Sequence, residues 1–347
     1  MAFGDADLSV DKILTIVLKN KILVMKKKLL LTLIVISSWL TMNAQGIEFK
    51  EHQNQIDVMI DGKLFTSYLT DPTLLKPCLY PVISPSGEMM TRRYPFEEVE
   101  GESKDHPHHT GVYFTYGSNG EVNGNSFWNR HEIPPQIKHI KVLEKSDGKD
   151  HATLSTISHW IGSGGKVILE EARKMIFSQV SDGYAIDFDI ALKASDDKVV
   201  FKDTKEGMFA IRVADWLTEQ NKGTLEEGTG EYLNAEGLKT EKNIWGKKSA
   251  WVRLEGEREA QKIGVAIYHH PGSLNFPTYW HARGYGCFSA NPIGQYDFEK
   301  GRVANAGSRQ LELAPGEEAV FKFRMVIYEG ERKKKDFDQE FKNYSKS

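Results

Sequence analysis

Cysteine is scarce in this chain, with only Cys78 and Cys287 among 347 residues. A framework of several disulfides is therefore excluded, and a chain of this length must rely on a large hydrophobic core. An exported protein can join two cysteines in one disulfide, and two free buried thiols are the alternative. The sequence leaves this choice open.

Three common enzyme signatures are also missing. The sequence has no glycine-rich dinucleotide fingerprint after a strand, no Walker loop and no Gly-x-Ser-x-Gly nucleophile elbow. These absences disfavour a nucleotide-dependent enzyme and a serine hydrolase. Charge of one sign is not concentrated either, because 45 basic and 48 acidic residues are mixed along the chain and give a net charge of −3. We therefore expect no nucleic-acid partner.

The N-terminal segment is typical of an exported protein. Three lysines at 26–28 precede a short apolar run at 29–40, and Ala44 offers a small residue for cleavage. This pattern predicts a signal peptide at 25–44, because the apolar run is too short for a membrane span. A membrane anchor is the alternative. We interpret residues 1–24 as a mis-assigned start before Met25. We expect a periplasmic or secreted domain at 45–347, without membrane contact after cleavage and of undetermined oligomeric state.

The remainder of the chain has the pattern of an all-β protein. Residues 184–192, 262–268 and 320–328 alternate polar and apolar side chains with period two, and Gly, Asn, Asp or Ser turns separate such runs. Helical periodicity is convincing only at about 334–344. We predict one large antiparallel β-sandwich with a short C-terminal helix.

Histidine is concentrated in two segments that lie far apart in the sequence. The first is Asp-His-Pro-His-His at 105–109, and the second contains His269, His270 and His281. Imidazole titrates near neutral pH and is also the commonest metal ligand. If the two segments meet in the fold, they form one composite polar site, which would indicate an enzyme. A three-histidine metal site is an alternative, but the spacing matches no compact metal motif, so we predict no metal or other cofactor.

Arginine, lysine and aromatic side chains flank these histidines. Arg92 and Arg93 lie in a proline-rich loop, where either one binds an anionic group or merely ties down the loop. Lys205, Glu206 and Arg212 follow a turn, where a surface ion pair is the alternative. The second segment also contains the residues expected at a sugar site, namely Trp280, Arg283, Tyr285 and Asn291.

An ordered set of short motifs resembles the PmoA-like family of secreted bacterial proteins, over roughly residues 50–328. The motifs include Lys-Pro-x-x-Tyr-Pro (76–81), Asp-His-Pro-His-His (105–109), Phe-Trp (127–128), Asp-Thr-Lys-Glu-Gly (203–207), Trp-Gly-Lys (245–247) and Pro-Thr-Tyr-Trp-His-x-Arg (277–283). The "methane oxygenase" label of that family is misleading, because a methane monooxygenase membrane subunit needs several spanning helices. The resemblance implies carbohydrate degradation, and in particular an oligosaccharide dehydratase of ulvan breakdown in marine Bacteroidetes.

We therefore hypothesise a lyase that removes water from the unsaturated uronic acid end of an acidic oligosaccharide. His109 and His281 would transfer protons, with Tyr285 as the alternative carrier. The residues expected to bind substrate are Arg92, Arg93, His108, Lys205, Glu206, Arg212, His270, Trp280, Arg283 and Asn291. Two alternatives stay open. A glycoside hydrolase could use two acids among Asp105, Glu171 and Glu206, and a sugar-binding module would use aromatic platforms alone.

Overall fold

The structure is a computed structural model that describes residues 21, 25–27, 46–129, 133–220 and 224–346. The chain divides into two units, 1–45 and 46–347. In the first unit only Lys21 and residues 25–27 are described, and they are helical. The predicted start and signal peptide therefore fall almost entirely outside the described residues. Within the described part of the chain, no helix is both long and apolar enough to span a bilayer.

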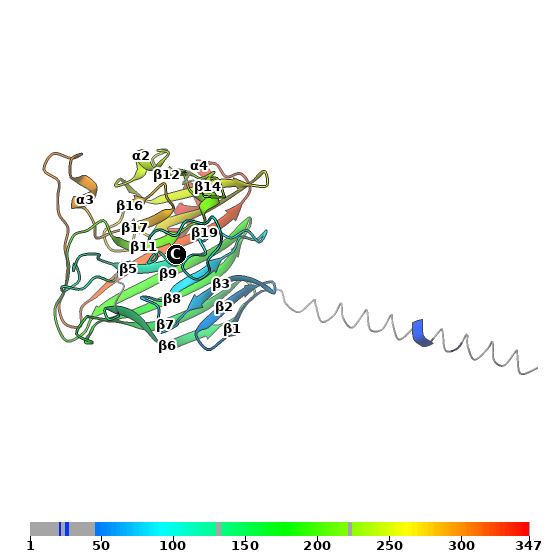
Figure 1. Cartoon of the computed structure of the whole chain (residues 1–347), viewed down its shortest axis with the longest axis horizontal. Helices are drawn as coiled ribbons and strands as arrows, with labels where there is room; N and C mark the ends of the chain where they lie inside the picture. Colours follow the sequence, from blue (N-terminus) through cyan, green and yellow to red (C-terminus); the bar gives the residue numbers. More distant parts are fainter. Residues whose placement is uncertain (1–20, 22–24, 28–45, 130–132, 221–223, 347) are drawn as a thin grey trace, which may run out of the picture. The chain divides into compact units, whose positions relative to one another are not determined.

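One sheet of the second unit has nine strands, and every neighbouring pair in it is antiparallel. In spatial order its strands are β1 (Ile47–Glu51), β2 (Gln55–Ile60), β3 (Lys63–Leu69), β4 (Cys78–Val82), β5 (Val112–Tyr116), β11 (Gly207–Arg212), β17 (Cys287–Asn291), β16 (Thr278–Ala282) and β13 (Lys248–Ser249). Strands from both halves of the chain thus lie side by side at its centre (Figure 1).

The second sheet has eight antiparallel strands. Their order is β12 (Glu231–Asn234), β14 (Trp251–Arg258), β15 (Gln261–His269), β19 (Glu318–Glu329), β9 (Gly183–Ala194), β8 (Val167–Val180), β7 (His151–Ile161) and β6 (Gln136–Ser146). The smaller elements are β10 (Val199–Phe201), β18 (Leu311–Leu313), η1 (Asp215–Leu217), α2 (Glu241–Ile244), α3 (Tyr296–Glu299) and α4 (Lys334–Tyr344).

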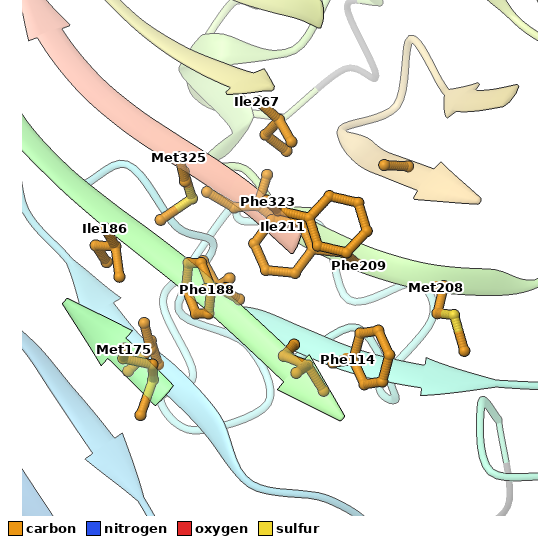
Figure 2. Packing of buried hydrophobic residues seen from close by; sticks show 14 of the residues in the cluster. Phe114, Met175, Ile186, Phe188, Met208, Phe209, Ile211, Ile267, Phe323 and Met325 are labelled. Carbon is orange, nitrogen blue, oxygen red and sulfur yellow. The ribbon is translucent and has the colours of Figure 1, made fainter. Parts of the chain in front are cut away.

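A layer of buried apolar side chains joins the two large sheets (Figure 2). Phe209 of the nine-stranded sheet stacks on Phe323 with ring centroids 4.6 Å apart and meets Phe188 edge-on at 4.7 Å. Phe188 and Phe323 belong to the eight-stranded sheet, so these contacts cross the interface. Each such side chain contributes roughly 1.5–3 kcal/mol by leaving water. The predicted antiparallel β-sandwich is confirmed, and the predicted C-terminal helix is α4.

The central strands of the nine-stranded sheet present different chemistry on their two faces. Successive side chains of a strand point to opposite faces, and residues paired in register share a face. The inner face, toward the sandwich core, carries one cross-strand row of apolar residues: Phe114, Phe209, Ala290 and Trp280. The adjacent row on the outer face consists of Tyr113, Ala210, Ser289 and His281.

The two cysteines are free buried thiols on the nine-stranded sheet. Cys78 lies in β4 and Cys287 in β17, and strands β5 and β11 lie between them. Three strand spacings amount to about 14 Å, which is well beyond the Cα separation that a disulfide spans. The structure thus favours the second of the two alternatives, and burial raises the pKa of each thiol to about 12.

Candidate active site

A cavity of about 430 Å³ lies where the two histidine-rich segments meet. It is lined by His106, His108, His109, Ser118, Trp128, Asn129, Lys205, Glu206, His281, Arg283 and Tyr285. His281 belongs to the outer-face row of the nine-stranded sheet, and the other lining residues come from the loops around it and from the residues that follow β5 and β16. The first segment and part of the second therefore converge as the sequence predicted.

A buried ionic anchor holds the loop at residues 105–109. Arg92 is 1% exposed and donates to the Asp105 carboxylate at 2.7 Å, to the Asp105 carbonyl at 2.6 Å and to the His106 carbonyl at 3.0 Å. Arg212 is fully buried and donates from Nη2 to the same carboxylate oxygen at 2.5 Å. Two arginines thus share one carboxylate beneath the loop, and these charge-assisted bonds fix its path.

Lys76 supports the same loop from below. It is 2% exposed, its Nζ donates to the His108 carbonyl at 2.8 Å, and it lies 4.6 Å from the centre of the Tyr113 ring. Burial lowers the pKa of this amine to about 7. The motif at 76–81 therefore acts through the loop backbone, and its lysine is not among the lining residues.

The rings of His106, His109 and Tyr285 lie in parallel planes. The His106 ring is 4.9 Å from that of His109 and 5.0 Å from that of Tyr285, with both interplanar angles at 5°. His106 adopts a positive φ of 45°, which is uncommon outside glycine, and its carbonyl accepts the His109 amide at 3.0 Å in a tight turn. This turn brings histidines three residues apart onto one stack.

His109 is a buried imidazole without hydrogen-bond partners among the residues that the structure describes. Its side chain is 2% exposed, both ring nitrogens lack a partner, and the edges of the Trp128 and His108 rings meet it at 5.5 and 4.4 Å. Burial lowers the pKa of His109 well below its usual value, and the positive charges around it, including Arg212 and Lys76, act in the same direction. The ring is neutral at pH 7, so one of its nitrogens keeps a lone pair.

His281 is also buried, but it has a specific partner. The Trp245 indole Nε1 donates a hydrogen bond to His281 Nδ1 at 3.2 Å. Burial lowers the pKa of His281 well below its usual value, and Arg283, Lys205 and His106 add repulsion against the charged form. Trp245 follows α2 and lies 5.0 Å from the Arg302 guanidinium, which also donates to its carbonyl at 2.8 Å.

Charged and phenolic groups complete the wall. Arg283 pairs through Nε with Glu241 at 2.6 Å, and Lys205 pairs with Glu206 at 2.5 Å. The Tyr285 ring lies 5.0 Å from the Arg212 guanidinium and 5.4 Å from that of Arg283. Burial raises the pKa of the Tyr285 phenol above its usual value, so this group stays protonated and can donate.

Several predicted substrate ligands lie elsewhere. Arg92 and Arg212 anchor the loop from behind the cavity wall, as the alternative for Arg92 anticipated. Arg93 lies outside the lining, with its Nη1 4.0 Å from Glu102. His270 lines a separate cavity of about 220 Å³ with Lys174, Asp187, Asp189, Lys322 and Tyr344 among its neighbours. None of these four residues lines the main cavity. Arg92 and Arg212 hold the loop at 105–109 from behind, Arg93 pairs with Glu102, and His270 follows β15 of the eight-stranded sheet.

Two further corrections concern Trp280 and Asn291. Trp280 is fully buried on the inner face and donates from its indole to the Ser249 carbonyl at 2.9 Å, because it alternates with His281 along β16. Asn291 is also fully buried and donates to the Thr204 carbonyl at 2.9 Å. It therefore fixes the turn that presents Lys205, and it lies outside the cavity lining. The structure keeps His108, His109, Lys205, Glu206, His281, Arg283 and Tyr285 at the cavity.

Sequence reasoning gave no role to several residues at or near the site. The motifs at 127–128 and 245–247 marked Trp128 and Trp245 without saying what they contact. Ser118 and Glu241 had no signal, since a lone serine or glutamate between strands resembles any surface residue. Among the described residues, no group of three or more His, Cys, Asp or Glu side chains is placed to hold a metal ion.

Comparison with known proteins identifies a family but no activity. A family model described as "Family of unknown function (DUF6807)" matches residues 55–342, and no curated protein matches the chain. Among solved structures, galactose 1-epimerase from Lactobacillus acidophilus NCFM is 11% identical, with a TM-score of 0.40 over 83% of this chain and 100% of that one.

Two other solved structures show the same degree of likeness. A galactose mutarotase related enzyme from Lactobacillus acidophilus is 9% identical, with a TM-score of 0.34 over 81% of this chain and 97% of that one. The galactosidase domain of an alpha-galactosidase-sucrose kinase is 10% identical, with a TM-score of 0.42 over 82% of this chain and 41% of that one. At these scores neither an activity nor a substrate transfers to this chain.

Proposed function

Because this chain belongs to DUF6807, a family of unknown function, its activity has to come from the site itself, and we propose that it is a carbon–oxygen lyase acting on acidic oligosaccharides. The observation that carries the proposal is the state of His109. It is a neutral imidazole with no hydrogen-bond partner in the described part of the chain, and it lines the same cavity as Lys205, Arg283 and a protonated Tyr285. A base, cations and a proton donor thus face one space.

Elimination of water from a sugar acid needs these groups. In the proposed reaction Arg283 and Lys205 hold the substrate carboxylate in exchange for part of their present pairing with Glu241 and Glu206. His109 takes the proton from carbon as the new double bond forms. The carbon–oxygen bond breaks with its electron pair on oxygen, and Tyr285 supplies the proton that completes the departing water. The tyrosinate then regains a proton from the imidazolium across the cavity.

The two alternatives have less support. A glycoside hydrolase needs two carboxylates flanking one bond, but Glu206 is the sole carboxylate among the described lining residues. Asp105 is engaged by Arg92 and Arg212, and Glu171 is 1% exposed and paired with Arg173. A sugar-binding module would not need a protonated phenol and two buried imidazoles facing its ligand.

The finer parts of the proposal rest on the sequence. The uronic acid substrate, with ulvan fragments as the named example, comes from the resemblance to the PmoA-like family. The periplasmic or secreted location comes from the N-terminal pattern at 25–44. Both are parts of the proposal that the lyase chemistry does not require.

The test is to incubate the full chain with unsaturated oligosaccharides released from an acidic polysaccharide by a lyase, with and without a chelator. Mass spectrometry of the products then discriminates the three functions. Loss of one water from the substrate supports the dehydratase. Gain of one water indicates hydrolysis, and unchanged oligosaccharide after long incubation with measurable binding indicates a binding module. Either of the last two results would overturn the proposal.

A further inference from the structure

The contact between Trp245 and His281 has a chemical consequence. An indole N–H can only donate, so the hydrogen bond at 3.2 Å occupies the lone pair of His281 Nδ1. A neutral imidazole carries one proton, which must therefore lie on Nε2. The tautomer of a histidine is set in this way by the bond that its other nitrogen makes.

We infer that Trp245 is a positioning residue that holds His281 as a permanently neutral Nε2–H donor to the ligand, so that His281 is neither the base nor a titrating group of this site. Accepting a proton would require Nδ1, and the proton already on the indole blocks it. The role toward a ligand rests on the proposed function, whereas the tautomer does not.

The groups around His281 act in the same direction. Arg283 lies just beyond the end of β16, two residues after His281. Lys205 and Glu206 approach from the turn that follows Thr204, and His106 lines the same cavity from the loop at 105–109. Three of these four oppose a positive charge on the ring, and Glu206 is already paired with Lys205. From α3, the Phe298 ring lies 6.2 Å away and adds no charge.

The segment that carries Trp245 is itself held firmly. Arg302 donates to the Trp245 and Gly246 carbonyls at 2.8 and 3.1 Å, and the Phe298 ring meets the indole edge-on at 5.5 Å. One helical turn earlier, Glu241 pairs with Arg283 and accepts the Gly284 amide at 3.0 Å. The short segment at 241–245 thus orients two cavity residues, His281 and Arg283, from outside the cavity.

The inference divides the work between the two buried imidazoles. His109 has no hydrogen-bond partner within the described ranges and keeps a lone pair for a proton, while His281 offers a fixed N–H to an oxygen of the substrate. Neutral histidine used as such an electrophile is a known device. Tyr285 is then left as the group that gives up a proton.

The test is nitrogen NMR of the histidine side chains in the full chain between pH 5 and 8, with His281→Gln used to assign the His281 signals among eleven histidines. We expect the wild-type protein to show His281 as a neutral Nε2–H tautomer over this whole range. In Trp245→Phe we expect loss of this tautomer preference or titration within the range. Activity should fall by about 10- to 100-fold, the loss typical when the orienting partner of a metal-bound histidine is removed and the scale we take over for His281.

Trp251→Phe is the matched control, because its indole also donates over 3.2 Å, but to Asp338 on α4. It should leave the His281 signals unchanged. Titration of wild-type His281, a proton on Nδ1, or the same His281 spectrum in Trp245→Phe would overturn the inference. If the Phe variant does not fold, the wild-type spectrum decides alone. A protein inactive on every oligosaccharide with the expected spectrum would refute the lyase while the tautomer stands.

Discussion

The two faces of the central strands of the nine-stranded sheet differ in whether their buried polar groups have hydrogen-bond partners. On the inner face, Phe209 and Trp280 are in contact with apolar neighbours, and the indole of Trp280 has a carbonyl partner. On the outer side, His109 is equally buried but leaves both ring nitrogens unpartnered. Leaving a buried polar group without a partner costs about 1–3 kcal/mol of stability. On the inner face burial therefore stabilises the fold, whereas at His109 stability is given up and a ring nitrogen stays available for reaction.

The largest effect is expected from substituting His109, the reactive group on the outer side. His109→Gln keeps a polar side chain of similar size but has no basic nitrogen, and a positioned base typically contributes about 10²–10⁴-fold to rate. We expect turnover of the unsaturated oligosaccharide to fall by this factor while the folded structure persists. Steady-state kinetics and near-ultraviolet circular dichroism check the two halves of the prediction. A fully active variant would remove His109 from the mechanism.

On the inner face the expected loss is one of stability. Phe209→Ala removes the ring that stacks on Phe323 and meets Phe188 edge-on between the sheets, and such truncations cost about 3–5 kcal/mol. Denaturant unfolding measures this loss. The matched control is Ser289→Ala on the outer row, which removes a hydrogen bond of 2.6 Å to the Gly207 carbonyl and should cost about 1 kcal/mol. Equal losses for the two variants would contradict the assignment of faces.

Buried neutral histidines also make stability depend on pH. Burial lowers the pKa of His269, which stacks on Phe323 at 5.2 Å, to about 3. Between pH 6.5 and 3 the unfolded chain therefore binds a proton that the folded chain does not. The unfolding free energy is therefore at its full value above the pKa that histidine has in the unfolded chain. It decreases as pH falls below that pKa, by about 1.4 kcal/mol per pH unit for each such group.

We expect the unfolding free energy to be smaller at pH 5 than at pH 7, with His109 and His281 adding to the slope in the same direction. Denaturant titrations of the wild type and His269→Gln at both pH values check this. The variant should show a shallower pH dependence, since the contribution of His269 is gone. An unchanged slope would mean that His269 is protonated in the folded state.

The sequence was informative about periodicity and weak about neighbours. Alternation over 184–192 correctly predicted β9, but period two cannot say which of two adjacent residues faces a site. Trp280 and His281 had equal claims, and only the register with Ser289 and Ala290 separates them. Strand order is non-local as well, because β11 lies between β5 and β17, and no motif spacing reveals that. Convergence of 105–109 with the whole second segment, from His269 to Tyr285, was predicted from residue chemistry, and only its part at 281–285 lines the cavity.

The smallest effect on activity is expected for His270, in the first half of the second histidine segment. This substitution tests whether activity depends on the histidines that line the main cavity or on any histidine of the two segments. His270 lies at the other cavity, edge-on to Tyr344 at 5.0 Å, and its Nδ1 accepts the Gly272 amide at 2.9 Å. His270→Ala should therefore change kcat/KM by less than about twofold and stability by about 0.5 kcal/mol. His108→Ala, at the main cavity, is its matched comparison and should reduce kcat/KM measurably. If His270→Ala lost activity to the same extent as His108→Ala, the catalytic centre would have to include residues of the eight-stranded sheet. The cavity on the outer face of the nine-stranded sheet would then not be the whole active site.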